Sequence, residues 1–475
     1  MDPPSPSTPG MLLRPPVFRG MKVLDRSVFR KAVDLAALKV DPKNLGLIRK
    51  ECAQDLLRVP RIAPIVKHDN GKVILLKLGV TPEDLSPLQQ KTKELIAKNN
   101  AEIIPYKFEV DYSFWTVDDI LSSILPESLL GETPGGYTAV GHIAHLNLRE
   151  QYLPYKYLIG QVILDKNPTL RTVVNKLDAI DTVYRNFKME VLAGDDDFWV
   201  EQSESGCRFQ FDFSKVYWNT RLHTEHDRLI SLFQRGEAVC DVMAGVGPFA
   251  VPAGKNGVIV LANDLNPDSY KAMVNNISLN KIAYTKAYNM DGRAFIHHAA
   301  AELEELAQGP PIENPFKKRS RTKPRQPVEV VSIPPTFQHY VMNLPASALE
   351  FLDAFKGVYH TRRHLFKPHT TAELPMIHVY CFTKEDPPTQ DLLGRIKEAL
   401  GWEMKEEEVR MHYVRKVAPM KDMYCCSFRL PAEVAFAAKD AQYVDIVPPT
   451  TTTTTTTTTE QRTGLRAESA KRPIV

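Results

Sequence analysis

At residues 240–250 the chain reads Cys-Asp-Val-Met-Ala-Gly-Val-Gly-Pro-Phe-Ala. A short apolar run enters a turn of the form Gly-x-Gly-x-x-Ala, with glycines at 245 and 247. Because Gly245 and Gly247 have no β-carbon, backbone N–H groups can approach a ligand closely where the next helix begins. Asp264 ends the next apolar run, where an acidic side chain can accept both hydroxyls of a ribose. The stretch therefore predicts a site for an adenosine-containing cofactor.

The sequence around this turn alternates between strand and helix patterns. We expect strands at 238–243, 257–263, 285–289, 339–343 and 376–383, and helices at 267–280, 292–307, 346–355 and 390–400. Repeated βα units predict a doubly wound α/β fold with a mostly parallel sheet. Two final strands at 409–417 and 424–430, joined by a turn with Pro419, predict an antiparallel edge.

The length of 475 residues predicts two or three domains. A smaller α+β domain is expected at 18–105, with a strand at 71–78. A second is expected at 106–213, with a helix at 115–125, before the cofactor domain at 214–445. Outside these, we expect a disordered or targeting segment at 1–17 and a disordered Thr-rich tail at 446–475. The Pro-rich, basic stretch 308–335 predicts a surface insertion, for which solvation and RNA contact both stay open.

Composition narrows the classes of protein. Hydrophobic residues make up 43% and charged residues 25%, as in globular proteins, and no apolar run has the length of a membrane span. The net charge of +3 does not by itself indicate a nucleic-acid binder. The six cysteines lack the spacing of a metal site, so we expect neither a metal nor a membrane partner. Basic residues dominate 1–31, which is compatible with a mitochondrial transit segment.

Two acidic residues favour S-adenosylmethionine over a nicotinamide cofactor. Asp241, just before the glycines, suits the cationic amino acid end of S-adenosylmethionine and would repel a pyrophosphate. Asp291, followed by Gly292, ends the third strand, where contacts to adenine would fall. A nicotinamide cofactor remains the rival, and Asp241 has a second interpretation as a cap on nearby backbone N–H groups.

The candidate reaction site has two parts. Asn343-Leu344-Pro345 follows the fourth strand, where the amide of Asn343 can offer a donor and an acceptor. Upstream, Arg221 and Glu225 are four residues apart and would share a helix face. They form either a weak surface ion pair or part of an active site in which Glu225 accepts a proton.

These residues resemble one known family. The ordered set is Tyr217, Arg221 and Glu225, then Asp241-Val-Met-Ala-Gly-Val-Gly-Pro-Phe, Asn263-Asp264-Leu-Asn-Pro and Met342-Asn343-Leu344-Pro345. It closely resembles the eukaryotic and archaeal tRNA (guanine(37)-N1)-methyltransferases over about residues 105–430. The upstream runs Gly141-His-Ile-Ala-His-Leu-Asn-Leu and Arg185-Asn-Phe-Lys-Met-Glu-Val-Leu-Ala-Gly are similar to the family's middle domain.

The resemblance implies a class I Rossmann-like methyltransferase domain that uses S-adenosylmethionine to methylate N1 of guanine 37 in tRNA. Glu225 then matches the general base, and Arg185 the arginine that stabilises charge on O6. Asn343 and Pro345 match residues that shape the target pocket, with Tyr217 and Arg221 beside it. Cofactor contacts would fall on His226, Asp264, Leu265, Asp291, Gly292 and Asn343. A monomer that binds tRNA with G at position 37 is expected, in the mitochondrial matrix, nucleus and cytoplasm.

Two other functions stay open. One branch of this fold transfers the aminocarboxypropyl group of the same cofactor during wybutosine synthesis, but it lacks Asn-Leu-Pro after the fourth strand. A non-catalytic tRNA-binding protein is the other alternative, although the intact Glu225, Asp264 and Asn343 argue against it. Arg362–Arg363 and Arg415–Lys416 are candidate phosphate contacts or simply solvated surface.

Overall fold

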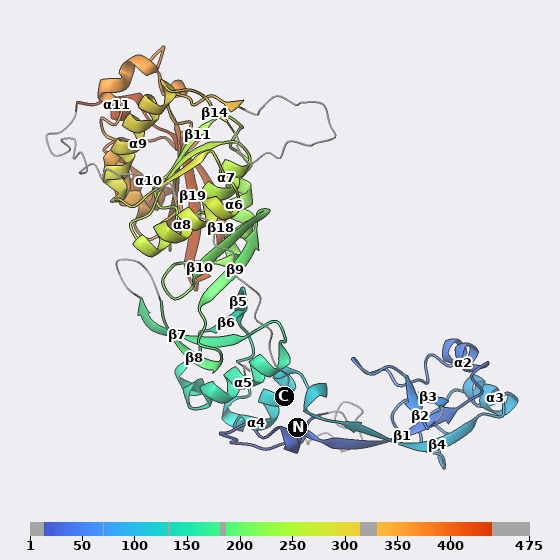
Figure 1. Cartoon of the computed structure of the whole chain (residues 1–475). Helices are drawn as coiled ribbons and strands as arrows, with labels where there is room; N and C mark the ends of the chain where they lie inside the picture. Colours follow the sequence, from blue (N-terminus) through green and yellow to red (C-terminus); the bar gives the residue numbers. More distant parts are fainter. Residues whose placement is uncertain (1–13, 70, 132–133, 181–186, 314–329, 439–475) are drawn as a thin grey trace, which may run out of the picture.

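The structure is a computed structural model that describes residues 14–69, 71–131, 134–180, 187–313 and 330–438. Three parts follow one another in an elongated, bent arrangement (Figure 1). A small unit near the N-terminus is joined by a two-stranded ribbon to a middle unit, and the large cofactor domain follows.

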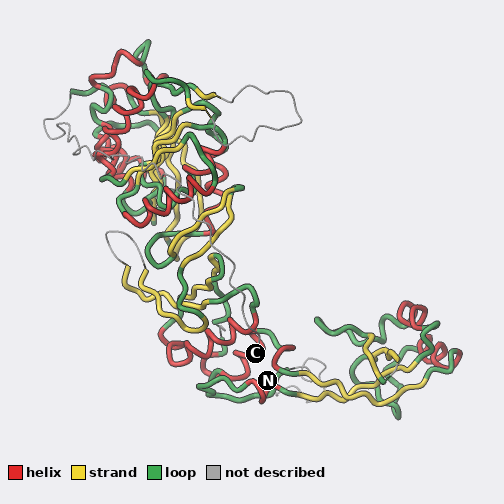
Figure 2. The backbone as a smooth tube through the Cα atoms, in the orientation of Figure 1, coloured by secondary structure: helices red, strands yellow, loops and turns green. Residues whose placement is uncertain are grey.

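A sheet of seven strands forms the centre of the large domain, with helices on both sides (Figure 2). Its order is β13 (Thr285–Tyr288), β12 (Ile259–Asn263), β11 (Ala238–Asp241), β16 (His339–Met342), β17 (Met376–Thr383), β19 (Lys421–Arg429) and β18 (Arg410–Ala418). The first five are parallel, whereas β19 runs antiparallel to both neighbours. The predicted doubly wound sheet with an antiparallel edge is confirmed.

Alternate residues of the strands pack into two separate hydrophobic cores, one on each face of the sheet. Cys240 and Val242 pack on one face with α9 (Gly292–Ala307), η6 (Ala348–Phe355) and α10 (Thr389–Leu400). Val239 and Val260 pack on the other with α6 (His223–Ile230) and α7 (Ala250–Lys255). Because successive strand residues point to opposite faces, strands buried on both faces are expected to be apolar throughout. This is why 238–240 and 257–262 read as continuous apolar runs.

The structure differs from the prediction of an α-helix at 346–355. The structure has a 3-10 helix there, η6, which begins at Ala348. Leu349, Leu352 and Phe355 are all buried at a spacing of three residues. This spacing stacks side chains on one face of a 3-10 helix. By contrast, α8 (Pro267–Leu279) begins as predicted, with Asn266 as N-cap and proline in the first turn.

The middle unit contains a four-stranded sheet and a hairpin. The sheet has the order β5 (Thr138–Val140), β6 (Ile143–Leu146), β7 (Thr172–Ile180), β8 (Phe187–Gly194), and α4 (Val117–Ile124) and α5 (Lys156–Lys166) accompany it. The hairpin β9 (Trp199–Glu204) and β10 (Cys207–Asp212) lies against α8, where Asn276 Oδ1 accepts from the N–H of Gln210 at 2.7 Å. The hairpin therefore joins the middle unit to the large domain.

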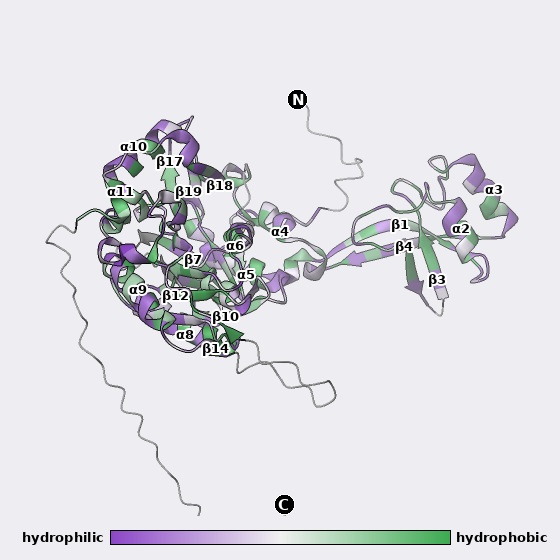
Figure 3. Ribbon diagram, turned by 90° about the horizontal axis from the view of Figure 1, so that it is seen from above, coloured by the Kyte–Doolittle hydropathy of each residue, from purple (hydrophilic) through white to green (hydrophobic). Residues whose placement is uncertain are grey.

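The N-terminal unit is built on β1 (Lys31–Lys39) and β4 (Glu102–Val110), which pair along nine residues. With β2 (Ile65–His68) and β3 (Gly71–Leu75) they form a sheet that carries α2 (Leu45–Glu51) and α3 (Gln90–Lys98). Figure 3 shows the β1–β4 ribbon reaching from this unit to the rest of the chain. Thus β4 crosses the boundary predicted at 105/106, and its last residue, Val110, lies in the core of the middle unit.

Residues Phe18 to Phe29 are part of the middle unit. The N–H of Phe18 donates to Ser123 O at 2.9 Å, and that of Gly20 donates to Ile124 O at 2.7 Å. Arg26 forms an ion pair with Asp165 at 2.7 Å. Part of the basic bias of 1–31 therefore has a structural role, and residues 1–13 of the predicted targeting segment lie outside the described residues.

The ends of the basic insertion form a short ribbon, β14 (Ile312–Glu313) paired with β15 (Val330–Val331). The basic residues of the insertion and the Thr-rich tail lie outside the described residues. Two-turn and shorter elements complete the described chain: η1 (Arg26–Phe29), η2 (Tyr112–Phe114), η3 (Glu127–Leu129), η4 (Glu150–Tyr155), η5 (Thr220–Leu222), η7 (His360–Leu365), η8 (Thr371–Glu373), η9 (Glu406–Glu408) and α11 (Ala432–Ala435). Among the described helices, none is long and apolar enough to cross a bilayer.

Trp115 is predicted to be a major contributor to the stability of the middle unit. It is 1% exposed, and its Nε1 donates to Phe29 O at 2.9 Å. Trp115→Ala should lower the free energy of unfolding by about 3–5 kcal/mol, because it leaves a large cavity and an unpaired carbonyl. Trp199→Ala, at a side chain 54% exposed, should change it by about 0.5 kcal/mol or less. Denaturant titration of both variants checks this, and equal losses would contradict it.

Candidate active site

The glycine turn lies at the carboxyl edge of the sheet, directly after β11. Gly245 and Gly247 have φ of 57° and 95°, a region that disfavours residues with a β-carbon. A β-carbon on Gly247 would lie 2.8 Å from Val251 Cγ2, whereas one on Gly245 would enter open space. The turn therefore packs tightly against α7 on one side and leaves room beside Gly245 on the other.

Asp264 links this turn to the start of α8. Its Oδ2 accepts from the N–H of Gly245 at 2.8 Å, and its Oδ1 accepts from the N–H of Asn266 at 2.9 Å. Burial raises the pKa of Asp264, and these two backbone hydrogen bonds oppose that change. Each carboxylate oxygen keeps a second acceptor position. The carboxylate is thus fixed beside the open space at Gly245, while Leu265 next to it is 50% exposed.

Asp241 lies in an environment that disfavours its charged form. It is fully buried, and neither carboxylate oxygen has a hydrogen bond of normal geometry among the described residues. Burial and the nearby charge of Asp264 raise the pKa of Asp241, which the N–H of Met243 offsets only in part. Asn343 Oδ1, after β16, is also buried without a described partner.

These unsatisfied atoms test the fit of the predicted cofactor. Buried polar groups nearly always have hydrogen-bond partners, so unpaired ones at the predicted cofactor site are positions that a bound group can satisfy. Two acids and an amide oxygen at one sheet edge suit a group with a cationic amine and hydroxyls. A pyrophosphate would instead add negative charge next to Asp241 and Asp264. The residues therefore fit S-adenosylmethionine, and Asp241 also interacts with the N–H of Met243, as the capping interpretation expects.

Asp291 and Gly292 lie at the start of α9. Asp291 is the N-cap, and its Oδ1 accepts from the N–H groups of Arg293 and Ala294. Gly292 is buried, and a β-carbon there would lie 3.0 Å from Phe351. Both residues thus have structural roles that the sequence prediction did not include, and adenine contact by them stays a prediction.

Glu225 lies on α6, where its carboxylate is buried and accepts several hydrogen bonds. Its Oε2 accepts from Arg228 Nε at 2.6 Å, and its Oε1 accepts from Arg228 Nη2 and from the Tyr380 hydroxyl, both at 2.7 Å. His412 Nε2 of β18 lies 3.3 Å from Oε2. The side chain is 5% exposed. The ion pair of Glu225 is therefore with Arg228, three residues on, and not the predicted surface pair with Arg221.

Tyr217 and Arg221 precede this helix in the chain, and His226 lies on it. Tyr217 is 49% exposed, and Arg221 donates to Thr138 Oγ1 on β5 at 3.2 Å. His226 is buried; its Nδ1 lies 2.5 Å from Glu204 Oε1, and its ring meets Phe249 edge-on. Glu204 is a partner that the sequence did not reveal. Arg185 lies outside the described residues.

Pro345 is held against the neighbouring strand, because its carbonyl accepts from the N–H of Phe382 on β17 at 3.0 Å. The chain after Asn343 is thereby fixed in place at the sheet edge. The residues missed by sequence reasoning, Arg228, Tyr380 and His412, come from three different elements. Only Arg228, on the same helix as Glu225, carried a local signal.

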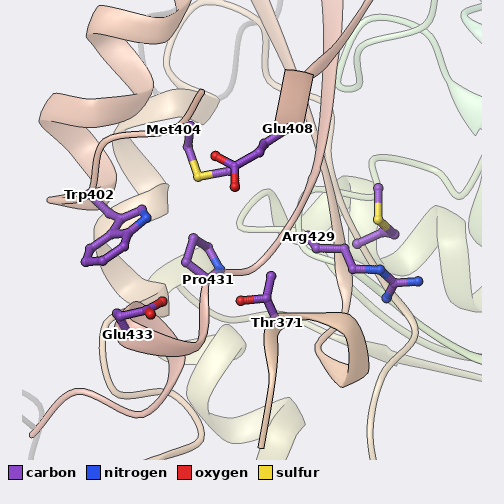
Figure 4. A pocket seen from close by; sticks show the side chains of 8 residues that line it. Thr371, Trp402, Met404, Glu408, Arg429, Pro431 and Glu433 are labelled. Carbon is purple, nitrogen blue, oxygen red and sulfur yellow. The ribbon is translucent and has the colours of Figure 1, made fainter. Parts of the chain in front are cut away.

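Figure 4 shows a pocket elsewhere on the large domain. It lies at the opposite edge of the sheet, where Met376 begins β17 and Arg429 ends β19. Its lining comprises Thr371, Met376, Trp402, Met404, Glu408, Arg429, Pro431 and Glu433. It is therefore separate from the glycine turn. Among the described residues, no cluster of three metal-ligating side chains is found.

Two known domain families match the chain. Residues 117–197 match the TYW2 N-terminal domain, and residues 200–304 match the TRM5/TYW2 methyltransferase domain. Solved structures with the same fold include Trm5b from Pyrococcus abyssi, with a TM-score of 0.54 at 22% identity, and aTrm5 in complex with tRNALeu, with 0.56 at 20%. Each alignment covers 83% of this chain and 99% of the other.

Sequence relatives are much closer. A protein of Schizosaccharomyces pombe is 53% identical over 88% of this chain and 96% of its own length. Relatives in Aspergillus fumigatus and Yarrowia lipolytica are 47% and 46% identical over 90% and 89% of this chain, and over 96% and 93% of their own lengths. All three are named tRNA (guanine(37)-N(1))-methyltransferase. With these identities, the predicted family is confirmed: the chain belongs to the tRNA (guanine(37)-N(1))-methyltransferases.

Proposed function

We propose that this protein transfers the methyl group of S-adenosylmethionine to N1 of guanine 37 in tRNA, with Glu225 as the base. Two features of the cofactor domain carry the proposal. One is the pair of acids beside the glycine turn, Asp241, which is fully buried, and Asp264, which is partly buried. The other is Glu225 on the helix that leads into the same domain.

The residues of the turn hold the cofactor. Asp264 accepts the ribose hydroxyls through the acceptor positions left by Gly245 and Asn266. Asp241 and the Asn343 amide oxygen receive donors from the amino acid end. S-adenosylmethionine, when bound, supplies the methyl group. The charge of its amine would satisfy Asp241, whose burial otherwise opposes its ionisation.

The target nitrogen carries a proton that must be removed. Guanine N1–H is a weak acid, so a base is needed as the ring nitrogen becomes a nucleophile. Arg228 and Tyr380 keep Glu225 oriented and leave an acceptor position on Oε2. Asn343 and Pro345 shape the pocket for the base, with Tyr217 and Arg221 beside it. Arg185 completes the set as the residue that stabilises charge on O6.

The aminocarboxypropyl transfer remains the second candidate, because the two matched domain families include the TYW2 branch. Parallel reactions with S-adenosylmethionine labelled in its methyl group or in its carboxyl group separate the two. We expect tRNA to gain the methyl label alone. Gain of the carboxyl label would overturn the proposal.

We further propose that the enzyme acts as a monomer and modifies tRNA in the mitochondrial matrix, nucleus and cytoplasm. Support for targeting is the basic bias of residues 1–31, of which Phe18 and Gly20 form backbone hydrogen bonds with α4. Deletion of the predicted targeting segment 1–17, which includes Arg14, should remove modification from mitochondrial tRNA and leave purified enzyme fully active. Persisting mitochondrial modification would contradict the targeting role.

A further inference from the structure

The general-base role leaves Glu225 with a proton after each reaction. Methylation of N1 releases one proton, and the side chain that receives it is 5% exposed. A buried carboxyl group exchanges protons with water only through a neighbouring group that can accept them. The enzyme therefore needs an exit for this proton before Glu225 can act again.

The hydrogen-bond acceptor positions of the Glu225 carboxylate leave one direction in which its proton can move on. A carboxylate has about four such positions. On Oε1, Arg228 Nη2 and the Tyr380 hydroxyl take both, and on Oε2 Arg228 Nε takes one. The remaining position, on Oε2, is the one that receives the N1 proton. His412 Nε2 lies 3.3 Å from the same atom, so the imidazole can take the proton after the methylated base has left.

The other groups around Glu225 cannot carry the proton away. Arg228 is already charged, and its guanidinium pKa is raised further by Glu225. Tyr380 is fully buried, and burial raises its pKa well above the ordinary value. Cys425, opposite His412 on β19, is also buried, and its pKa is raised to about 12. All three keep their protons at neutral pH.

His412 differs from them in two respects. Its side chain is 35% exposed, so it reaches from Glu225 to solvent. Desolvation is the largest cause that lowers the pKa of His412, and the charge of Arg228 is the second. Glu225 raises this pKa, whereas Arg410 on the same strand lowers it. The imidazole is therefore neutral at pH 7 and has a lone pair free to accept a proton.

We propose that His412 is a proton relay that returns Glu225 to its ionised form after each methyl transfer. This inference rests on Glu225 being the base. The N1 proton of guanine moves to Oε2 of Glu225, then to Nε2 of His412, and from the imidazolium to water. His412 acts through Glu225 and is a positioning and relay residue.

The experiment compares single and multiple turnovers of His412→Gln. Because a single turnover does not require Glu225 to pass its proton on, the single-turnover rate constant should stay within about twofold of the wild type, and KM for tRNA should not change. The steady-state kcat should fall roughly tenfold or more, and added imidazole should restore it. His360→Gln, at an exposed histidine on η7, is the matched control and should neither lose activity nor respond to imidazole.

Two results would overturn the relay. One is an unchanged kcat in His412→Gln. The other is an equal fall of the single-turnover rate and kcat without rescue by imidazole, which would indicate a purely structural role. The base assignment fails separately, if Glu225→Gln keeps the wild-type single-turnover rate, whatever His412→Gln does.

Discussion

Glu225→Gln should slow the chemical step of methyl transfer about a thousandfold, which corresponds to about 4 kcal/mol of barrier. The amide keeps the shape of the side chain and one acceptor for Arg228, but it cannot take a proton from N1. Binding of S-adenosylmethionine should be unchanged, since Glu225 faces Arg228, Tyr380 and His412 and not the glycine turn. Rapid-quench single-turnover assays and calorimetry measure the two effects.

Asp227→Asn is the matched control, because Asp227 lies on the same helix and is exposed. It should retain the wild-type rate. Thermal unfolding of both variants separates catalysis from stability, since loss of a buried ion-pair partner can itself destabilise a protein. A Glu225→Gln enzyme with normal turnover would remove the general-base assignment.

Asp264→Ala should weaken S-adenosylmethionine binding about a hundredfold. Hydrogen bonds to a charged group contribute about 1.5–3 kcal/mol each, and two ribose hydroxyls are at stake, with 1.4 kcal/mol for each factor of ten. The change also removes the acceptors of the Gly245 and Asn266 N–H groups, so the turn loses its support. Calorimetric titration with the cofactor measures the loss.

The neighbouring Asp268 provides the control for this change. It lies in the first turn of α8 and is 41% exposed, with Lys271 3.6 Å away. Asp268→Ala should bind the cofactor within about twofold of the wild type. Equal affinities of Asp264→Ala and the wild type would show that Asp264 does not hold the ribose.

Sequence reasoning predicted the elements that obey local rules. The glycine turn, the proline start of α8 and the whole of α9 and β17 lie where their patterns placed them. Asp241 and Asp264 were found because they end strands at the glycine turn. These positions depend on residues close in the chain, which is why one sequence was enough to locate them.

What the sequence could not predict depends on contacts between distant residues. Tyr380 reaches Glu225 across 155 positions of the chain, and Glu204 meets His226 only because the β9–β10 hairpin lies beside α6. The expected pairing of Arg221 with Glu225 was wrong because Arg221 lies in η5, before α6 begins. Residues four apart share a face in an α-helix, whereas this segment begins as a 3-10 helix.

The most direct test of the account is the identity and position of the modified nucleoside. Purified protein is incubated with S-adenosylmethionine and two tRNA transcripts that differ only in G or A at position 37, and the nuclease fragments are analysed by mass spectrometry. We expect 1-methylguanosine at position 37 of the first transcript and no modification of the second. A methyl group at another nucleotide, or none with protein that binds the cofactor, would contradict the account.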